Sequence, residues 1–511
     1  SYLTRFESHF GDRGFKRLMK DGAWFTNARY EYGATLTSPG HATIATGANP
    51  SEHGIVANYW YTPNSSERSY SVGDEGVQPL GTTELRAAAH SPHHLQIPTF
   101  GDDLKRAYPD AKVWSTALKP HASVLMGGQF PDVVIWWSAS DGHFVSSSQY
   151  FDELPEWCQS LNSEHFSDTF FHATWDRALP EAAYSLCRED AAPYESGARV
   201  FWTNTMPKVL AKNLPDPNMV FYKQLEASPF GNELVFEVAR RAIIHESLGA
   251  DDTPDILFIS LSATDNCGHL FGPDSHEVFD LMVRTDAQLA AWLDFLDETI
   301  GRDKYQVLLT GDHGAGIAPE RAQELGMDGG RLDARAMFDD IDDALTASLG
   351  ISLDNEYYLT GIQLPWVYLN TPLLERMNVD VDIAAAAVAD FAASYDGIDT
   401  AIATADIMNR PVRSLTPLER IVRNNIFDGR SGDVYLHVKA HWARKGMCAD
   451  HGTAHDYDRH VPVIFMGTAF KPGIYDQPVD MRDPAATLRA VLGLKSNVTP
   501  SGRVLHEALV R

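Results

Sequence analysis

Two short stretches decide the fold, DILFISL at residues 255–261 and QVLLT at residues 306–310. Both are continuous apolar runs, the pattern of strands that are buried on both faces of an α/β sheet. Between them, apolar side chains recur at helical spacing from Val278 to Ile300, which predicts an amphipathic helix. Strand, helix and strand in this order predict a βαβ crossover, so we expect the two strands to be parallel.

Further along the chain, a third apolar run, VPVIFM at residues 461–466, predicts another buried strand. The expected fold class is therefore α/β, with a mostly parallel sheet flanked by helices. Two stretches, 151–229 and 346–429, have weaker periodicity and many aromatic and acidic residues. We interpret them as insertions or cap segments on this core rather than as independent domains.

Composition excludes several classes of protein. A hydrophobic content of 44% with 22% charged residues is typical of a globular chain and not of a disordered or fibrous one. No run approaches 18 uninterrupted apolar residues, so no membrane span is expected. The net charge of −27 argues against a nucleic-acid-binding surface, because such surfaces need basic contacts to phosphates. The sequence carries no signal of oligomeric state.

The cysteines and the first residues say little about structure. Four cysteines are too few and too scattered for a disulfide framework or a cysteine-based zinc module. Cys158 and Cys187 could be bridged in an oxidising compartment. The chain starts at Ser1 without Met and without a leader, which we interpret as a processed, trimmed or partial chain.

Polar clusters follow the first two predicted strands. Asp265 and His269 stand four residues apart after the first strand, and Asp312 and His313 are adjacent at the end of the second. Taken singly, each cluster is explained as well or better by a polar turn. Because ligands bind at the carboxyl edge of parallel strands, two such clusters at that edge together predict a metal site.

A third cluster, at residues 451–460, contains three histidines: His451, His455 and His460. Three histidines within ten residues are more than a solvated turn needs. We expect one or at most two of them to be metal ligands, and the others to be surface or supporting groups.

Residues 36–47 predict a short helix with Thr37 at its start. Pro39 suits the first turn of a helix, and Gly47 suits its end. The backbone N–H groups at a helix start favour an alkoxide or a phosphate oxygen. The alternative is that Thr37 or Ser38 is an ordinary N-cap. A threonine hydroxyl needs a base or a metal to become a nucleophile, which the polar clusters would supply.

Together these motifs resemble the alkaline phosphatase superfamily, in its threonine-nucleophile branch. That branch includes broad-specificity periplasmic phosphomonoesterases and the nucleotide pyrophosphatase/phosphodiesterases. The resemblance covers nearly the whole chain and rests on motifs in the expected order, at residues 37–41, 46–47, 53–55, 58, 262–265, 268–269, 311–314, 451–453, 457–458 and 461–462. Residues 146–148, 154–157 and 430–434 also resemble the phosphomonoesterase relatives. It implies one alkaline-phosphatase-like catalytic domain over residues 1–511.

The resemblance also implies an activity, zinc-dependent hydrolysis of small phosphate monoesters through a phosphothreonine on Thr37, with release of inorganic phosphate. Asn58 would hydrogen-bond a phosphoryl oxygen, and the location would be periplasmic or secreted. Two Zn²⁺ ions are implied, one held by Asp265, His269 and His451 (with His455 as the fallback for His451), the other by Asp312, His313 and Thr37.

The sequence departs from the family in two places. A further zinc-ligating Asp lies on an N-terminal strand in the family, and that strand is missing before Ser1, so we expect an incomplete second zinc site. Lys119 matches a lysine that contacts phosphate, but His121 stands where phosphomonoesterase relatives have Arg. Imidazole is shorter, lacks the bidentate fork and is mostly neutral, so diesters should become more competitive.

Two other functions stay open. One is a phosphodiesterase or nucleotide pyrophosphatase, in which the aromatic run at residues 59–61 could stack a base, although such a run is more often packing. The other is a catalytically impaired homologue that acts as a binding module, which the missing Asp and His121 both favour.

Overall fold

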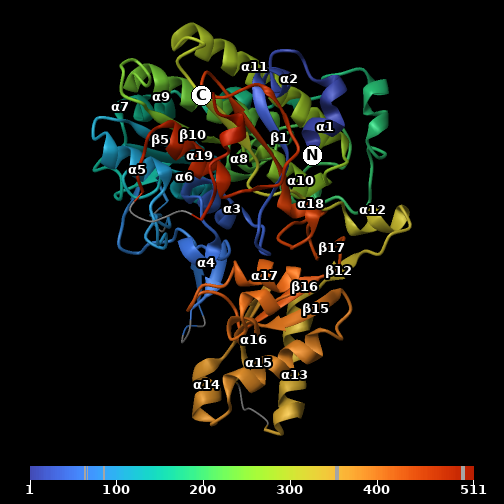
Figure 1. Cartoon of the computed structure of the whole chain (residues 1–511). Coiled ribbons are helices and arrows are strands. Elements are labelled where there is room, and N and C mark those ends of the chain that lie inside the picture. Colours follow the sequence, from blue (N-terminus) through green and yellow to red (C-terminus); the bar gives the residue numbers. More distant parts are fainter. Residues whose placement is uncertain (63–64, 66, 85–86, 352–355, 497–500, 511) are drawn as a thin grey trace.

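The chain folds into two lobes of unequal size. The computed structural model describes residues 1–511 except 63–64, 66, 85–86, 352–355, 497–500 and 511. The larger, upper lobe in Figure 1 holds both chain ends, and the smaller, lower lobe is made mainly of the orange segments.

The first sheet of the large lobe is built around β1 and β18. Its order is β11-β18-β1-β19, and β20 also pairs with β1. β18 runs antiparallel to both of its neighbours, whereas β19 and β20 are parallel to β1. The strands are β1 (Gly22–Arg29), β11 (Val307–Thr310), β18 (His460–Met466), β19 (Gly473–Tyr475) and β20 (Val479–Asp480).

The second sheet of the large lobe has the order β10-β5-β6-β7-β4. Its first three strands are parallel, and β7 turns back antiparallel to β6. The strands are β4 (Pro79–Leu80), β5 (Val113–Ala117), β6 (Val133–Ser138), β7 (His143–Ser147) and β10 (Ile256–Ser260).

The three predicted strands exist, as β10, β11 and β18, but the predicted crossover is wrong. β10 and β11 belong to different sheets, and each is an edge strand among the described residues. Helices α10 (Ala263–Phe271) and α11 (His276–Thr299) connect them. The order strand, helix, strand indicates a parallel pair only when both strands share a sheet; here β11 pairs antiparallel with β18 instead. The α/β class is confirmed, with mixed rather than mostly parallel sheets.

Helices pack against these strands and against one another, and their side chains form several hydrophobic clusters. They include α2 (Phe15–Asp21), α3 (Thr37–Thr46), α5 (Phe100–Ala107), α6 (Pro120–Gly127), α9 (Pro229–Glu246) and α19 (Asp483–Val491). Residues 151–229 add α7 (Glu156–Ser163), α8 (Met219–Glu226), the short pair β8 (Thr174–Trp175) and β9 (Lys208–Val209), and several 3₁₀ turns. Aromatic side chains of this stretch, such as Trp175 and Trp202, join the same cluster as α9 and α11.

The small lobe has its own sheet and its own hydrophobic cluster. The sheet is antiparallel, in the order β13-β14-β16-β15. Its strands are β13 (Leu359–Gln363), β14 (Trp366–Leu369), β15 (Ile398–Ala403) and β16 (Val434–Val438), and its helices are α13 (Ala334–Leu349), α14 (Thr371–Arg376), α15 (Val381–Ala392), α16 (Thr404–Met408) and α17 (Pro417–Arg423). A ribbon of β12 (Gly330–Leu332) and β17 (Trp442–Arg444) leads back to the large lobe.

This lobe extends beyond the predicted insertion at residues 346–429 at both ends, and residues 352–355 of that range lie outside the described ones. Among the described residues, no helix combines the length and apolarity needed to cross a bilayer. All four cysteines, including Cys158 and Cys187, are free thiols.

Candidate active site

Three polar segments meet where β10 and β11 end. Asp265 lies in the first turn of α10, directly after β10, and His269 follows one turn later. Asp312 and His313 come directly after β11. His451 lies in the loop before the short helix α18 (Asp456–Arg459), which leads into β18.

Three of the predicted ligands converge on one point. A carboxylate oxygen of Asp265 and one ring nitrogen each of His269 and His451 lie within 4.8 Å of one another. Asp265 Oδ1 is 3.5 Å from Nε2 of His269 and 3.5 Å from Nε2 of His451. One carboxylate and two imidazoles are the donor set of many catalytic zinc sites. We refer to Asp265, His269 and His451 as the first cluster.

Backbone carbonyls orient the imidazoles of the site. In His269, His451 and His313, Nδ1 is within hydrogen-bond distance of a carbonyl oxygen. The acceptors are the carbonyls of Ala449, Thr35 and Gly314, at 3.0, 2.9 and 2.9 Å. A carbonyl only accepts, so Nδ1 is the donor and Nε2 carries the lone pair. Each Nε2 faces Asp265, as a metal ligand requires, and the residues present therefore fit a metal ion.

The protonation states of Asp265 and His451 also suit a metal site. Burial, with help from His313, lowers the pKa of His451 to about 3, so its imidazole is neutral at physiological pH. Burial alone would raise the pKa of Asp265, but Lys119 and the surrounding imidazoles outweigh it and hold the pKa well below its usual range. An ionised carboxylate and a neutral imidazole are the forms that bind metal.

Asp312, His313 and Thr37 form a second cluster beside the first. His313 Nε2 is 3.4 Å from Asp312 Oδ2 and 3.4 Å from Thr37 Oγ1. The same nitrogen lies 4.0 Å from Asp265 Oδ1, so the two clusters adjoin. His41 Nδ1 lies 3.4 Å from Asp312 Oδ2 and donates to the Thr37 carbonyl at 2.8 Å.

Thr37 is the first residue of α3, and its side chain does not cap the helix. The N-cap residue is Leu36, and no side chain makes a cap hydrogen bond. The ordinary N-cap explanation of Thr37 and Ser38 is therefore wrong. Gly40 lets α3 approach the second cluster, because a Cβ at this position would lie 2.2 Å from the carbonyl oxygen of Asp312.

Asn58 lies beside the start of α3. Its Oδ1 accepts a hydrogen bond from the backbone N–H of Ser38, at 2.8 Å. Ser71, which follows β3 (Arg68–Tyr70), contacts the hydroxyl of Ser38 at 2.8 Å. Among the described residues the amide N–H₂ of Asn58 has no partner, so it is available as a donor.

Lys119 and His121 stand at the start of α6 with different partners. The Lys119 ammonium pairs with Asp265 Oδ2. Burial would lower the pKa of Lys119, but Asp265 outweighs it and raises the pKa. His121 Nδ1 hydrogen-bonds the Tyr70 hydroxyl, and burial, assisted by Lys119, lowers the His121 pKa well below its usual range. A charged lysine and a neutral histidine thus occupy the two positions.

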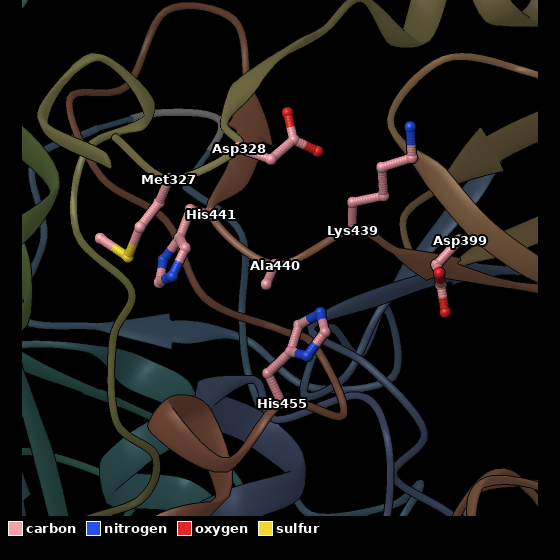
Figure 2. Close-up of a pocket in the computed structure, with 7 residues that line it drawn as sticks. All are labelled: Met327, Asp328, Asp399, Lys439, Ala440, His441 and His455. Carbon is pink, nitrogen blue, oxygen red and sulfur yellow. The ribbon is translucent and has the colours of Figure 1, made fainter. Parts of the chain in front are cut away.

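His455 does not join the first cluster, so its use as the fallback for His451 is not supported. Its Nε2 donates to the Val438 carbonyl at 2.8 Å, and its ring packs on Tyr457 at 5.2 Å. His455 lines a separate pocket of about 620 Å³. Figure 2 shows His455 in this pocket, with Lys439 and Asp399 on the side away from Met327. His460 Nε2 contacts the Thr26 carbonyl at 2.8 Å and also lies outside the cluster.

Several residues around the site carried no role in the sequence analysis. Asp450, next to His451, pairs with Arg444 and lies 4.0 Å from His269 Nδ1. Asp458 accepts two hydrogen bonds from Thr453. The Asp-His pair at 450–451 repeats the pair at 312–313, and that repetition is a signal that could have identified Asp450.

Comparison with known proteins agrees with this geometry. Residues 1–458 match the family described as type I phosphodiesterase / nucleotide pyrophosphatase. Alkaline phosphatase PhoV of Synechococcus elongatus is 32% identical over 99% of this chain and 90% of its own length. Alkaline phosphatase PafA of Elizabethkingia meningoseptica is 31% identical over 100% of this chain and 92% of its own. A crystal structure of alkaline phosphatase PafA with one threonine, one asparagine, one lysine and one arginine substituted superposes with a TM-score of 0.92 at 29% identity, covering 100% of this chain and 96% of that one.

Proposed function

Because this chain belongs to the type I phosphodiesterase / nucleotide pyrophosphatase family, in the threonine-nucleophile branch of the alkaline phosphatase superfamily, we propose that it hydrolyses phosphate monoesters through a phosphothreonine on Thr37. Family membership makes it a phosphoric ester hydrolase; the ester type, the metal and the intermediate are our proposal. The observation that carries it is the buried Thr37 hydroxyl, 4% exposed and 3.4 Å from His313 Nε2, beside the first cluster.

In the proposed reaction, the Thr37 hydroxyl gives its proton to water and its oxygen attacks the phosphorus in line with the leaving oxygen. The P–O bond to the leaving group breaks, and the leaving oxygen keeps the electron pair and takes up a proton from water. A water molecule then attacks the phosphothreonine and transfers its hydroxyl to phosphorus. The bond between Thr37 Oγ1 and phosphorus breaks, inorganic phosphate is released, and Thr37 regains its proton.

Zinc is the metal we propose, because a carboxylate and imidazole set suits it better than Mg²⁺. Asp265, His269 and His451 would hold one ion, and Asp312, His313 and Thr37 a second. When bound, zinc supplies positive charge that activates the threonine hydroxyl and stabilises the charge that develops in the transition state. The second cluster has only two His or Asp ligands among the described residues, so we expect metal content nearer to one zinc per chain than two, measured by elemental analysis. Full occupancy of two would contradict this.

Two groups would bind the phosphoryl oxygens. The free amide N–H₂ of Asn58 would donate to one oxygen, and the Lys119 ammonium would compensate the dianion of a monoester. The substituted PafA structure supports this set. Its altered threonine and asparagine are as far apart in sequence as Thr37 and Asn58, and its altered lysine and arginine as far apart as Lys119 and His121.

A second candidate is hydrolysis of phosphodiesters. Neutral His121, already paired with Tyr70, offers no second positive charge to a monoester dianion. A diester carries one negative charge less, so it loses less from this replacement. The catalytically impaired alternative is less well supported, because the nucleophile and the first cluster are both present. Within the aromatic run at 59–61, Trp60 is fully buried and cannot stack a base, whereas Tyr59 is 38% exposed.

The test is turnover of p-nitrophenyl phosphate and of bis-p-nitrophenyl phosphate by the wild type and by Thr37→Ala, with zinc and with chelator. We expect zinc-dependent hydrolysis of the monoester that Thr37→Ala reduces at least about a thousandfold. Thr46→Ala, at the far end of α3, is the matched control and should stay within about twofold of the wild type. If the wild type hydrolyses neither ester, the result supports the catalytically impaired binding module. If it hydrolyses the diester faster than the monoester, the result favours the second candidate.

We also propose a periplasmic or secreted location, on the family resemblance. Fractionation of the native source tests it, and activity confined to the cytoplasm would contradict it.

A further inference from the structure

A fully buried residue, Asp458, joins the loops that carry His451 and His313. Oδ2 of Asp458 accepts two hydrogen bonds from Thr453, one from the backbone N–H at 2.9 Å and one from the hydroxyl at 2.6 Å. The backbone carbonyl of Asp458 accepts from the N–H of Gly314, at 2.7 Å. One residue thus contacts both loops without touching either imidazole.

The same network reaches the acceptors that orient the two imidazoles. Thr35 donates its hydroxyl to the Thr453 carbonyl at 2.8 Å, and its own carbonyl accepts from His451 Nδ1 at 2.9 Å. On the other side, the carbonyl of Gly314 accepts from His313 Nδ1 at 2.9 Å. Hydrogen bonds therefore link Asp458 to both acceptors, through Thr453 and Thr35 for His451 and through Gly314 for His313.

The contact between the two loops is too tight to be incidental. A Cβ on Gly314 would lie 2.1 Å from the carbonyl oxygen of Tyr457, the residue before Asp458. Packing between the two loops would not by itself require an aspartate at position 458. Its side chain is 0% exposed, and Oδ1 has no hydrogen-bond partner among the described residues. A buried carboxylate with an unpaired oxygen costs stability that an apolar side chain would not.

We infer that Asp458 is a positioning residue that, through Thr453, Thr35 and Gly314, aims Nε2 of His451 and His313 at the metal positions. The inference rests on the proposed function, because it assumes that these nitrogens bind metal. It predicts that the acceptor oxygen of Asp458, rather than its charge, matters for metal affinity. Outer-shell partners of this kind typically change metal affinity by 10–100-fold.

The experiment compares zinc affinity, by competition with a chelator, in the full chain and in two variants at this position. Asp458→Leu removes the acceptor while keeping the branched shape of the side chain, and we expect zinc affinity to fall at least about tenfold. Asp458→Asn keeps one oxygen that can accept both Thr453 hydrogen bonds, so we expect affinity within about threefold of the wild type. Asp456→Leu, two residues earlier and largely exposed, is the matched control and should leave affinity unchanged.

Thr453→Val provides a second measurement if Asp458→Leu does not fold. It removes only the hydroxyl donor, and we expect an intermediate loss of zinc affinity. The melting temperature of each zinc-free variant separates positioning from folding, because a purely structural role would lower it without a selective loss of zinc affinity. Wild-type zinc affinity in folded Asp458→Leu or Thr453→Val would overturn the inference, and so would an Asp458→Asn variant as weak as Asp458→Leu. A wild type that binds no zinc would refute the proposed function instead.

Discussion

The two clusters of the site are built in different ways. In the first, Asp265, His269 and His451 contribute atoms within 4.8 Å of one another, and neighbouring carbonyls hold both imidazoles. In the second, Asp312 also faces His41, and the third group is the hydroxyl of the proposed nucleophile. A site that only holds an ion can be closed by the protein, whereas a site that does chemistry keeps a position for a reacting group. We therefore expect the first cluster to govern metal binding and the second to govern turnover.

Replacing the carboxylates of Asp265 and Asp312 one at a time should separate metal binding from turnover with the largest effect. Asp265→Asn removes the negative charge that Nε2 of His269, His313 and His451 all face. We therefore expect zinc affinity to fall at least about a hundredfold and turnover about a thousandfold. Asp312→Asn should lose similar turnover but keep the tighter zinc. Metal analysis after dialysis, with turnover of p-nitrophenyl phosphate, checks both variants. Equal zinc loss in the two variants would show that the clusters are not distinct.

Moving α3 should affect only the second cluster. In Gly40→Ala the new Cβ must displace the Asp312 backbone, 2.2 Å away, or shift the helix that carries Thr37. Misplacement of a reacting group by about 1 Å can cost a factor of about 100, so we expect kcat to fall by that order while zinc stays bound. Gly268→Ala is the control, because a Cβ there meets nothing within 4 Å. Loss of zinc in Gly40→Ala would contradict the separation.

A charge at position 121 should sharpen the choice between monoesters and diesters. His121→Arg adds a cation two residues from Lys119, and a charge-assisted hydrogen bond is worth about 1.5–3 kcal/mol. We expect the ratio of kcat/KM for the mono and bis p-nitrophenyl esters to rise about tenfold. His121→Gln removes the imidazole without adding charge and should leave the ratio near that of the wild type. An unchanged ratio in His121→Arg would mean that this position does not contact the substrate.

The smallest expected effect concerns two buried carboxylates that belong to neither cluster. Glu195 and Glu277 are buried beside Arg188 and Lys208, and burial, with Glu277 nearby, raises the pKa of Glu195 from 4.5 to about 8. The pKa values of Asp265 and Asp312 are lowered instead, because cations and imidazoles face them. The folded chain thus binds a proton at Glu195 more tightly than the unfolded chain does. Its contribution to stability is full below about pH 4.5 and is lost as the pH rises through about 8.

Glu195→Gln cannot ionise, so its melting temperature should fall less than that of the wild type between pH 5 and pH 8.5. We expect the two slopes to differ by a few degrees over this range, measured by calorimetry. Identical slopes would show that Glu195 is not protonated in the folded chain. Zinc affinity should not change, because Glu195 contacts neither cluster.

Much of the fold and site could be predicted from local pattern. The three apolar runs are strands, the helix expected between Val278 and Ile300 is α11, and Thr37 begins a helix. The polar residues after β10 and β11 do meet. The crossover between those strands could not be predicted, because strand pairing depends on β18, which lies about 150 residues further along the chain. The small lobe also contains residues on both sides of 346–429, because α13 begins at Ala334 and β16 pairs with β14 and β15.

The residue types that stand after each strand and at the start of α3, and so the class of chemistry, follow from the amino-acid order alone. Which histidine joins Asp265, His451 rather than His455, follows only from the folded chain. That choice depends on which ring nitrogen finds a carbonyl acceptor, and the acceptor of His451 is Thr35, 416 residues away in sequence. Local spacing determines secondary structure and turns, whereas the direction of a lone pair is determined by hydrogen bonds that form only after distant segments pack together.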